Sequence, residues 1–237
     1  MINPSAGRLF LIPNFIHPDA GVETMPAAVA EAAGPLRIFI VENARSCRAL
    51  LKKIIPGFPL QECEYFVCDQ NTRLEDIHEF LESRKSQDMG IVAEAGMPCV
   101  ADPGAQVVRQ AHELGMRVVP LVGPSAILLA LAASGLNGQN FVFHGYLPKE
   151  REARKRKIKE LEQASQLKNQ TQIVMETPYR GGHLFEDLLL VCDPRTKLCV
   201  ACDLTGPGEM IQTCSIDNWR TQLINLIDRP ALFLFQR

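Results

Sequence analysis

Strand-like and helix-like segments alternate along this 237-residue chain almost from one end to the other. Short apolar runs bounded by turn residues are followed by segments whose apolar residues recur at helical spacing. Two strands that are connected by a helix usually run parallel to each other. The alternation therefore predicts an α/β fold with helices covering the sheets. The predicted strands are residues 8–13, 37–42, 63–68, 89–95, 116–122, 139–148, 171–178, 197–204 and 230–236.

The pattern changes after residue 122, because a long and highly charged helix then replaces the regular alternation. We therefore expect two α/β domains, residues 1–122 with a mainly parallel sheet and residues 123–237. Thr72 and Glu75 have the spacing of a capping box at the start of the third helix. The predicted helices are residues 22–34, 44–54, 71–85, 104–115, 124–135, 149–168, 179–191 and 216–227.

The composition is that of an ordinary globular protein, with 46% hydrophobic and 22% charged residues. A formal net charge of −2 gives no overall attraction to nucleic acid. The first residues lack the pattern of a signal peptide, and the longest apolar stretch, residues 126–133, is too short to span a bilayer. We therefore expect a cytoplasmic protein with reduced thiols. Cys199 and Cys202 form a C-x-x-C pair, but within a predicted strand they point to opposite faces, which indicates structural cysteines and no metal site.

The fourth predicted strand runs into AEAGMPCVADPG, residues 93–104. In an open α/β sheet, ligands bind beyond the carboxyl ends of the strands. Gly96 lets a ligand approach the backbone, and Pro98 and Pro103 restrict the path of the chain. The loop therefore suits a flat polar ligand such as a nucleoside, although a simple tight turn is the alternative. The chain has no P-loop and no G-x-G-x-x-G after its first strand, which argues against the common phosphate cradles.

Four segments together resemble the tetrapyrrole methylase superfamily, and most closely its branch of ribosomal small-subunit RNA cytidine 2′-O-methyltransferases. They are AGMPCVADPG, VRQAHELGMRVVPLVGPSA, LAASGL and FVFHGYLPK, between residues 95 and 149. METPYR (175–180) and CDLTGPGE (202–209) extend the resemblance further along the chain. It implies two α/β domains with S-adenosylmethionine (SAM) bound in the cleft between them, and a homodimer.

The resemblance also implies which residues contact SAM, mostly through backbone atoms. The loop of residues 93–104 would cup the methionine and ribose portions of the cofactor. The implied contacts are Ile16, Gly96, Met97, Pro98, Val100, Ser125, Ala126, Met175, Leu204 and Ala231.

A hydroxyl acceptor for a methyl group benefits from a nearby base. The acids at predicted strand ends and in the loops beyond them are the candidates, and they are Glu42, Glu94, Asp102 and Glu176. Asp102 has an alternative role as the N-cap of the helix that starts near Gly104, and Glu176 has an alternative role in an ion pair with Arg180. The sequence alone does not select one of these acids.

The segment KEREARKRKIK, residues 149–159, holds seven basic residues. Such a helix could bind the phosphates of ribosomal RNA, with Arg151, Arg154, Lys155 and Arg156 as candidate contacts. The alternative is a solvated helix face on which these lysines and arginines form ion pairs with neighbouring glutamates.

Four motifs depart from the pattern of the superfamily branch. Residues 93–96 read AEAG in place of S-D-A-G, and the final strand normally follows K-G-E-F but here lies in DRPALF, residues 228–233. Residues 13–25 read PNFIHPDAGVETM in place of a P-T-P-I-G-N-L motif, and residues 42–45 read ENAR in place of E-D-T-R. The main expectation is a SAM-dependent methyltransferase that acts on the ribose 2′-O of ribosomal RNA. A small-molecule methylase with a tetrapyrrole-like substrate and a non-catalytic SAM-binding module are the alternatives.

Overall fold

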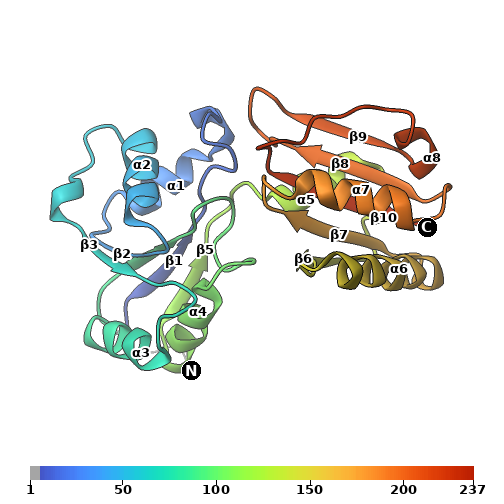
Figure 1. Ribbon diagram of the computed structural model, residues 1–237. Helices are drawn as coiled ribbons and strands as arrows, with labels where there is room; N and C mark the ends of the chain where they lie inside the picture. The colour runs from blue at the N-terminus through green and yellow to red at the C-terminus, as the bar shows by residue number, and fades with distance from the viewer. Residues whose placement is uncertain (1–5) are drawn as a thin grey trace. The chain divides into compact units, whose positions relative to one another are not determined.

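The computed structural model describes residues 6–237, which form two compact units. The first unit ends at Ser125, and the second runs from Ala126 to Arg237. The boundary expected from the sequence lay three residues earlier, after residue 122. Each unit contains one five-stranded sheet with helices packed on both of its faces (Figure 1).

The sheet of the first unit is entirely parallel, with the strand order β3-β2-β4-β1-β5. Side chains alternate across it, so that Phe10 packs toward α1 and α2 while Leu9 packs toward α3 and α4. The expected parallel α/β arrangement is therefore present. Its elements are β1 (Arg8–Ile12), α1 (Ala27–Ala33), β2 (Ile38–Val41), α2 (Ala44–Ile54), β3 (Glu64–Val67), α3 (Leu74–Ser83), β4 (Met89–Val92), α4 (Gly104–Glu113) and β5 (Arg117–Pro120).

Two helix starts in this unit differ from the prediction. The helix expected over 22–34 is divided into a 3₁₀ turn, η1 (Val22–Thr24), and α1, because Pro26 stands between them. A second 3₁₀ turn, η2 (Leu60–Glu62), precedes β3. Thr72 does not cap α3: its hydroxyl bonds with Asp69, and Arg73 occupies the cap position without a side-chain hydrogen bond.

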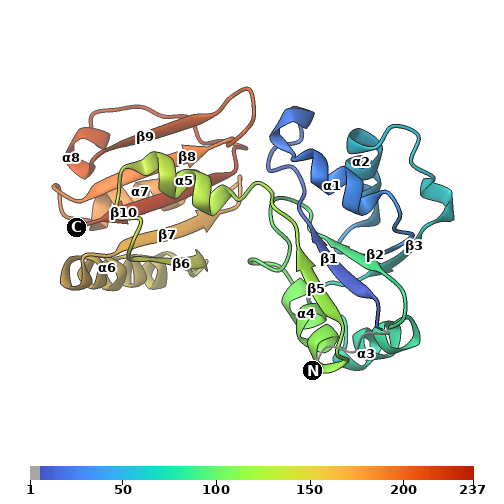
Figure 2. The ribbon, with the colours of Figure 1, turned by 180° about the vertical axis from the view of Figure 1, so that it is seen from behind.

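The second unit has a mixed sheet with the strand order β6-β7-β10-β8-β9. Only β6 and β7 run parallel to each other, and the remaining neighbours are antiparallel. The main core lies between the sheet and α6, α7 and α8, and α5 packs on the other face against β9 and β10 (Figure 2). The elements are α5 (Ala126–Ser134), β6 (Phe141–Tyr146), α6 (Arg151–Lys168), β7 (Thr171–Glu176), α7 (Gly181–Val191), β8 (Lys197–Cys202), β9 (Met210–Ser215), α8 (Ile216–Trp219) and β10 (Ala231–Gln236).

The end of the chain contains the largest departure from the predicted elements. Residues 210–215 form the edge strand β9, which the sequence did not predict, and the helix expected over 216–227 stops at Trp219. Cys199 and Cys202 are buried in β8 as expected, and the side chain of Cys202 belongs to the core under α6 and α7. No helix among residues 6–237 is both long and apolar enough to cross a membrane.

Candidate functional site

Three loops meet at the carboxyl end of the parallel sheet in the first unit. The backbone of Asn14, just after β1, pairs with that of Gly96, with N–H to oxygen distances of 2.9 and 3.1 Å. Gly96 has a left-handed φ of +65°, and a Cβ placed on it would lie 3.6 Å from the carbonyl oxygen of Pro124 and 3.9 Å from Ile16. The segments that carry the expected contacts Ile16, Gly96 and Ser125 therefore come together.

The second half of the loop of residues 93–104 is shaped by a carboxylate. One oxygen of Asp102 accepts the N–H groups of Cys99, at 2.9 Å, and of Gly104, at 2.7 Å. Cys99 and Ala101 both have left-handed φ values, 68° and 61°, which non-glycine residues rarely adopt. Asp102 is not the N-cap that the sequence suggested, because Pro103 occupies that position, but it bonds to the first residue of α4 from just outside the helix and also holds the turn that precedes it.

The hydrogen bonds of this loop leave specific backbone groups open. Among residues 6–237, the N–H groups of Met97 and Val100 donate no hydrogen bond. Val100 is half exposed and Met97 is partly exposed, whereas Pro98 is buried. Two of the residues expected to contact the cofactor therefore offer unused donors to a ligand.

A buried amide holds the first half of the same loop, and sequence reasoning missed it. Asn14 is only 5% exposed, and its side-chain nitrogen donates to the carbonyl oxygens of Ala93, at 2.9 Å, and Glu94, at 3.0 Å. The same nitrogen lies 3.1 Å from the hydroxyl oxygen of Ser46 in α2. The only signal in the sequence is a polar residue placed directly after a buried strand.

Two acids at this edge, Asp102 and Glu42, have raised pKa values. Burial raises the pKa of Asp102 above its usual value, and the two backbone N–H groups that it accepts oppose this rise. Burial also raises the pKa of Glu42, which follows β2, and the negative charges of Asp102 and Glu94 add to the rise. Glu94 itself is exposed. Three of the four candidate acids therefore lie at one edge of the first sheet.

The remaining expected contacts converge at one edge of the second sheet. Ala231 begins β10 and pairs with Glu176 at the end of β7 and with Cys202 at the end of β8. Met175 and Leu204 therefore lie on either side of Ala231, whereas Ala126 is the first residue of α5.

Ion pairs hold the loops at this second edge. Arg180 donates to one oxygen of Glu176 at 2.6 Å, which confirms the ion pair that the sequence left open, and the N–H of Thr177 donates to the same oxygen. Within the described chain, the other oxygen of Glu176 is buried without a hydrogen-bond partner. Arg229 bonds to Asp203 at 2.5 Å and so ties the segment before β10 to the loop after β8.

A groove of about 740 Å³ lies beside this edge, between the turn after β7, the first half of α7 and the segment before β10. Tyr179, Leu223 and Ile227 line it and are largely exposed. This groove was not predicted from the sequence, because Leu223 and Ile227 lie where a helix was expected.

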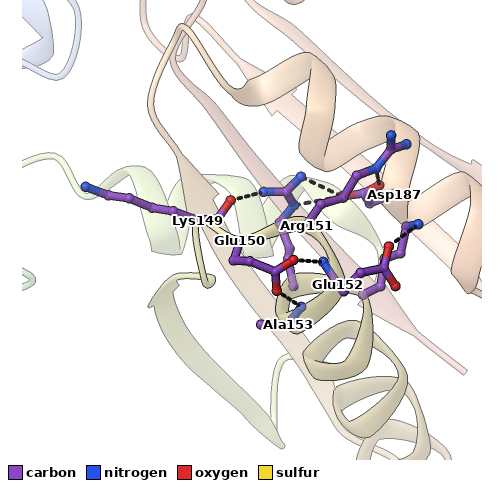
Figure 3. A network of polar contacts seen from close by, with 8 residues as sticks. Lys149, Glu150, Arg151, Glu152, Ala153 and Asp187 are labelled. Carbon is purple, nitrogen blue, oxygen red and sulfur yellow. Dashed lines mark hydrogen bonds and ion pairs between the residues drawn. The ribbon is translucent and has the colours of Figure 1, made fainter.

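The charged helix α6 presents fewer free cations than the sequence suggested. Arg154 is 5% exposed and bonds to one oxygen of the fully buried Asp187 at 2.6 Å. Arg151 bonds to the other oxygen of Asp187 at 3.0 Å (Figure 3). The expectation that Arg154 contacts RNA is therefore corrected, because its guanidinium faces the interior of the unit. Lys155 pairs with Glu152, and Arg156 is exposed.

The glutamates of α6 act locally. Glu150 caps the helix by accepting the N–H groups of Glu152 and Ala153 (Figure 3). Lys157 pairs with Glu160, three residues further along, at 2.6 Å. Within the described chain, Lys149, Arg156 and Lys159 are the exposed cations of this segment that form no ion pair, whereas Arg151 is exposed but paired with Asp187.

Comparison with known proteins gives consistent results. Residues 40–219 match the family model described as Tetrapyrrole (Corrin/Porphyrin) Methylases. Ribosomal RNA small subunit methyltransferase I from Vibrio cholerae is 35% identical over 152 residues, which cover 60% of this chain and 51% of that protein. The protein of the same name from Pseudomonas aeruginosa is 28% identical over 209 residues, which cover 88% of this chain and 70% of that protein. The matched part of the chain thus spans about half the length of the Vibrio cholerae protein.

Solved structures resemble the whole fold at low sequence identity. The crystal structure of the methyltransferase CobJ superposes with a TM-score of 0.63 and 16% identity, over 98% of this chain and 95% of that chain. A cobalt precorrin-4 methyltransferase superposes with a TM-score of 0.59 and 17% identity, over 97% and 94% of the two chains.

Proposed function

The chain belongs to the tetrapyrrole (corrin/porphyrin) methylase family, and from that premise we propose that it transfers a methyl group from SAM to the ribose 2′-O of small-subunit ribosomal RNA. The observation that carries the choice of substrate is that both relatives described above are named as ribosomal RNA small subunit methyltransferases. We further propose that the protein acts as a cytoplasmic homodimer.

The loop of residues 93–104 fits the cofactor. SAM supplies a methyl group that is already activated on a sulfonium, so the protein has to hold and orient the reactants and exclude water. The open N–H groups of Met97 and Val100 suit the polar portions of such a ligand. A loop held in shape before binding loses little conformational entropy when the ligand arrives.

In the second unit, Met175, Leu204 and Ala231 are the proposed cofactor contacts. Their convergence at the adjoining ends of the neighbouring strands β7, β10 and β8 supports a shared role. Leu204 and Ala231 are almost fully buried, so backbone groups are the proposed points of contact there.

Glu42 is the proposed proton acceptor for the ribose hydroxyl. A raised pKa brings a carboxylate closer to the working pH and makes it a better general base. Asp102 is committed to backbone N–H groups, and Glu176 is committed to Arg180. The Glu42→Gln variant should lose at least about a hundredfold in kcat while binding SAM as the parent does.

The exposed cations of α6 are the proposed phosphate contacts. Each phosphate contact that is lost should reduce the slope of log affinity against log salt by about one unit. The double variant Arg156→Glu, Lys159→Glu should therefore bind RNA more weakly and with a flatter salt dependence. Arg195→Glu is the control, because Arg195 is an exposed arginine just before β8, at the other end of the second sheet.

Calorimetry with SAM and S-adenosylhomocysteine (SAH), followed by a transfer assay, tests the proposal. Labelled methyl groups should appear in small-subunit ribosomal RNA isolated without this modification, and one phosphodiester bond should become resistant to alkali, because a 2′-O-methyl group cannot attack the phosphate. Transfer to a tetrapyrrole but not to RNA would support the small-molecule methylase. SAM binding without transfer to either acceptor would support the binding module, and no SAM binding would refute the proposal.

A further inference from the structure

We propose that Asn14 is the positioning residue that sets the ligand-binding shape of the loop of residues 93–104. This inference rests on the proposed function, because it assigns to Asn14 the task of presenting the backbone that would hold SAM. Asn14 itself touches no reacting atom. It lies in residues 13–25, the segment that departs most from the pattern of the superfamily branch.

All the polar atoms of the Asn14 side chain are in use. Its nitrogen donates to the carbonyl oxygens of Ala93 and Glu94 and lies within hydrogen-bond distance of the Ser46 hydroxyl, and its oxygen accepts the N–H of Phe15 at 2.8 Å. The side chain therefore joins three segments, the loop after β1, the first turn of α2 and the loop after β4. A buried amide with all its partners is costly to replace, because each orphaned partner loses its hydrogen bond.

The bonds of Asn14 fall on the first half of the loop, where the Ser46 hydroxyl also donates to the carbonyl oxygen of Glu94, at 3.4 Å. Asp102 bonds only to Cys99 and Gly104, in the second half. In the first half, the side-chain bonds to residues 93 and 94 fix the direction of the chain as it leaves β4, and the backbone pair with Gly96 continues that direction. The N–H of Met97 follows immediately, so its orientation depends on Asn14.

An amide is the side chain that this position requires. The donor must face two carbonyl oxygens while the acceptor faces the N–H of Phe15, and Asp offers acceptors only. Asn14→Asp keeps the size of the side chain but turns a carboxylate oxygen toward the carbonyl oxygens of Ala93 and Glu94. The loop would have to move away from it.

The test compares three variants by calorimetry with SAH and by thermal unfolding. Asn14→Asp should weaken SAH binding at least about tenfold. Ser46→Ala removes one of the three partners of the amide nitrogen and should weaken binding about two- to threefold without a change in Tm. Asn137→Asp is the matched control, because Asn137 donates to the carbonyl oxygen of Asn169 and accepts backbone N–H groups at the opposite end of the second sheet. SAH affinity in the control should remain that of the parent.

Amide hydrogen exchange at Gly96 separates the failure of this inference from the failure of the proposed function. The Gly96 N–H donates to the Asn14 carbonyl oxygen, so Asn14→Asp should speed its exchange in the ligand-free protein while amides of β7 keep their rates. Unchanged exchange at Gly96, or SAH affinity within twofold of the parent, would overturn the role of Asn14. A parent protein that binds no SAH refutes the proposed function, and the exchange rate at Gly96 then still decides whether Asn14 sets the shape of the loop.

Discussion

The two sheets end in loops that are held by different chemistry. At the edge of the first sheet, side chains bond to backbone: Asn14 donates to two carbonyl oxygens, and Asp102 accepts two N–H groups. At the edge of the second sheet, ion pairs between side chains are added to such bonds, as in Glu176 with Arg180 and Arg229 with Asp203. A side chain that bonds to backbone dictates the path of that backbone, whereas an ion pair mainly fixes how elements lie against each other.

This difference predicts where substitutions will act. Where a ligand is to be recognised by backbone groups, their positions must be set before it arrives, and side-chain bonds to backbone do this. Buried ion pairs contribute little net stability, but breaking one of them is costly because it leaves an uncompensated charge. Substitutions of side chains that bond to backbone at the first edge should therefore affect ligand binding most. Substitutions in the ion pairs of the second unit should affect stability most.

The largest expected effect is at Asp187. Asp187→Ala leaves Arg154 buried without its carboxylate and should lower the free energy of unfolding of the second unit by about 3–5 kcal/mol. Trp219 is the single tryptophan and is buried in this unit, so its fluorescence reports the urea transition. Asp217→Ala is the control, since its side chain is 73% exposed and 3.9 Å from Arg220, and it should cost less than about 0.5 kcal/mol. Equal losses of unfolding free energy in the two variants would contradict the claim that the buried ion pair matters more to stability than the exposed one.

A smaller loss is expected at the edge of the second sheet. Arg180→Ala leaves the carboxylate of Glu176, whose side chain is 1% exposed, with the N–H of Thr177 alone, and should cost about 2 kcal/mol. Adding Glu176→Gln should restore part of this loss, because no buried charge then remains unpaired. Urea unfolding followed by Trp219 fluorescence gives the unfolding free energies of the parent, the two single variants and the double variant, which together form a double-mutant cycle. Additive losses would show that the two residues do not act as a pair.

Most of the fold could be predicted from the sequence because its signals are local. Apolar runs and helical spacing revealed nine of the ten strands in the described chain, and Gly and Pro marked the loop of residues 93–104. The strand β9 was missed because its residues are all only half-buried and its pairing with β8 follows a Gly- and Pro-containing turn. Such an edge strand lacks a strong apolar run of its own.

The candidate site was harder to predict because its contacts join distant parts of the chain. Asn14 and the carbonyl groups that it holds are 79 and 80 residues apart, so nothing near Asn14 in the sequence indicates its role. Arg154 was expected at the surface because its neighbours are charged, yet its partner Asp187 lies 33 residues further along. A charge pattern shows that a helix is polar, but not which of its charges are buried with a partner.

At the edge of the first sheet, removing the negative charge of Asp102 should not lower the free energy of unfolding. Because burial raises the pKa of Asp102 above the reference value of 3.8, its contribution to stability is complete below that value and is lost as the pH rises through the folded-state pKa. Asp102→Asn keeps an oxygen for both N–H groups and removes this pH dependence. Its free energy of unfolding at pH 7 should equal that of the parent or exceed it by up to about 1 kcal/mol, measured by urea unfolding followed by circular dichroism. A loss of stability at pH 7 would show that the charge itself holds the loop.

The smallest expected effect is on Glu42 in the Asp102→Asn background. Burial is the larger cause of the raised pKa of Glu42, and the charge of Asp102 is the next. Removing that charge should therefore lower the pKa of Glu42 only part of the way toward its usual value, as measured by carbon NMR of its carboxyl group. The remaining elevation would confirm that desolvation prepares Glu42 to accept a proton. A pKa that fell all the way to its usual value would mean that Asp102 alone had perturbed Glu42, and the proposed base would lose its physical basis.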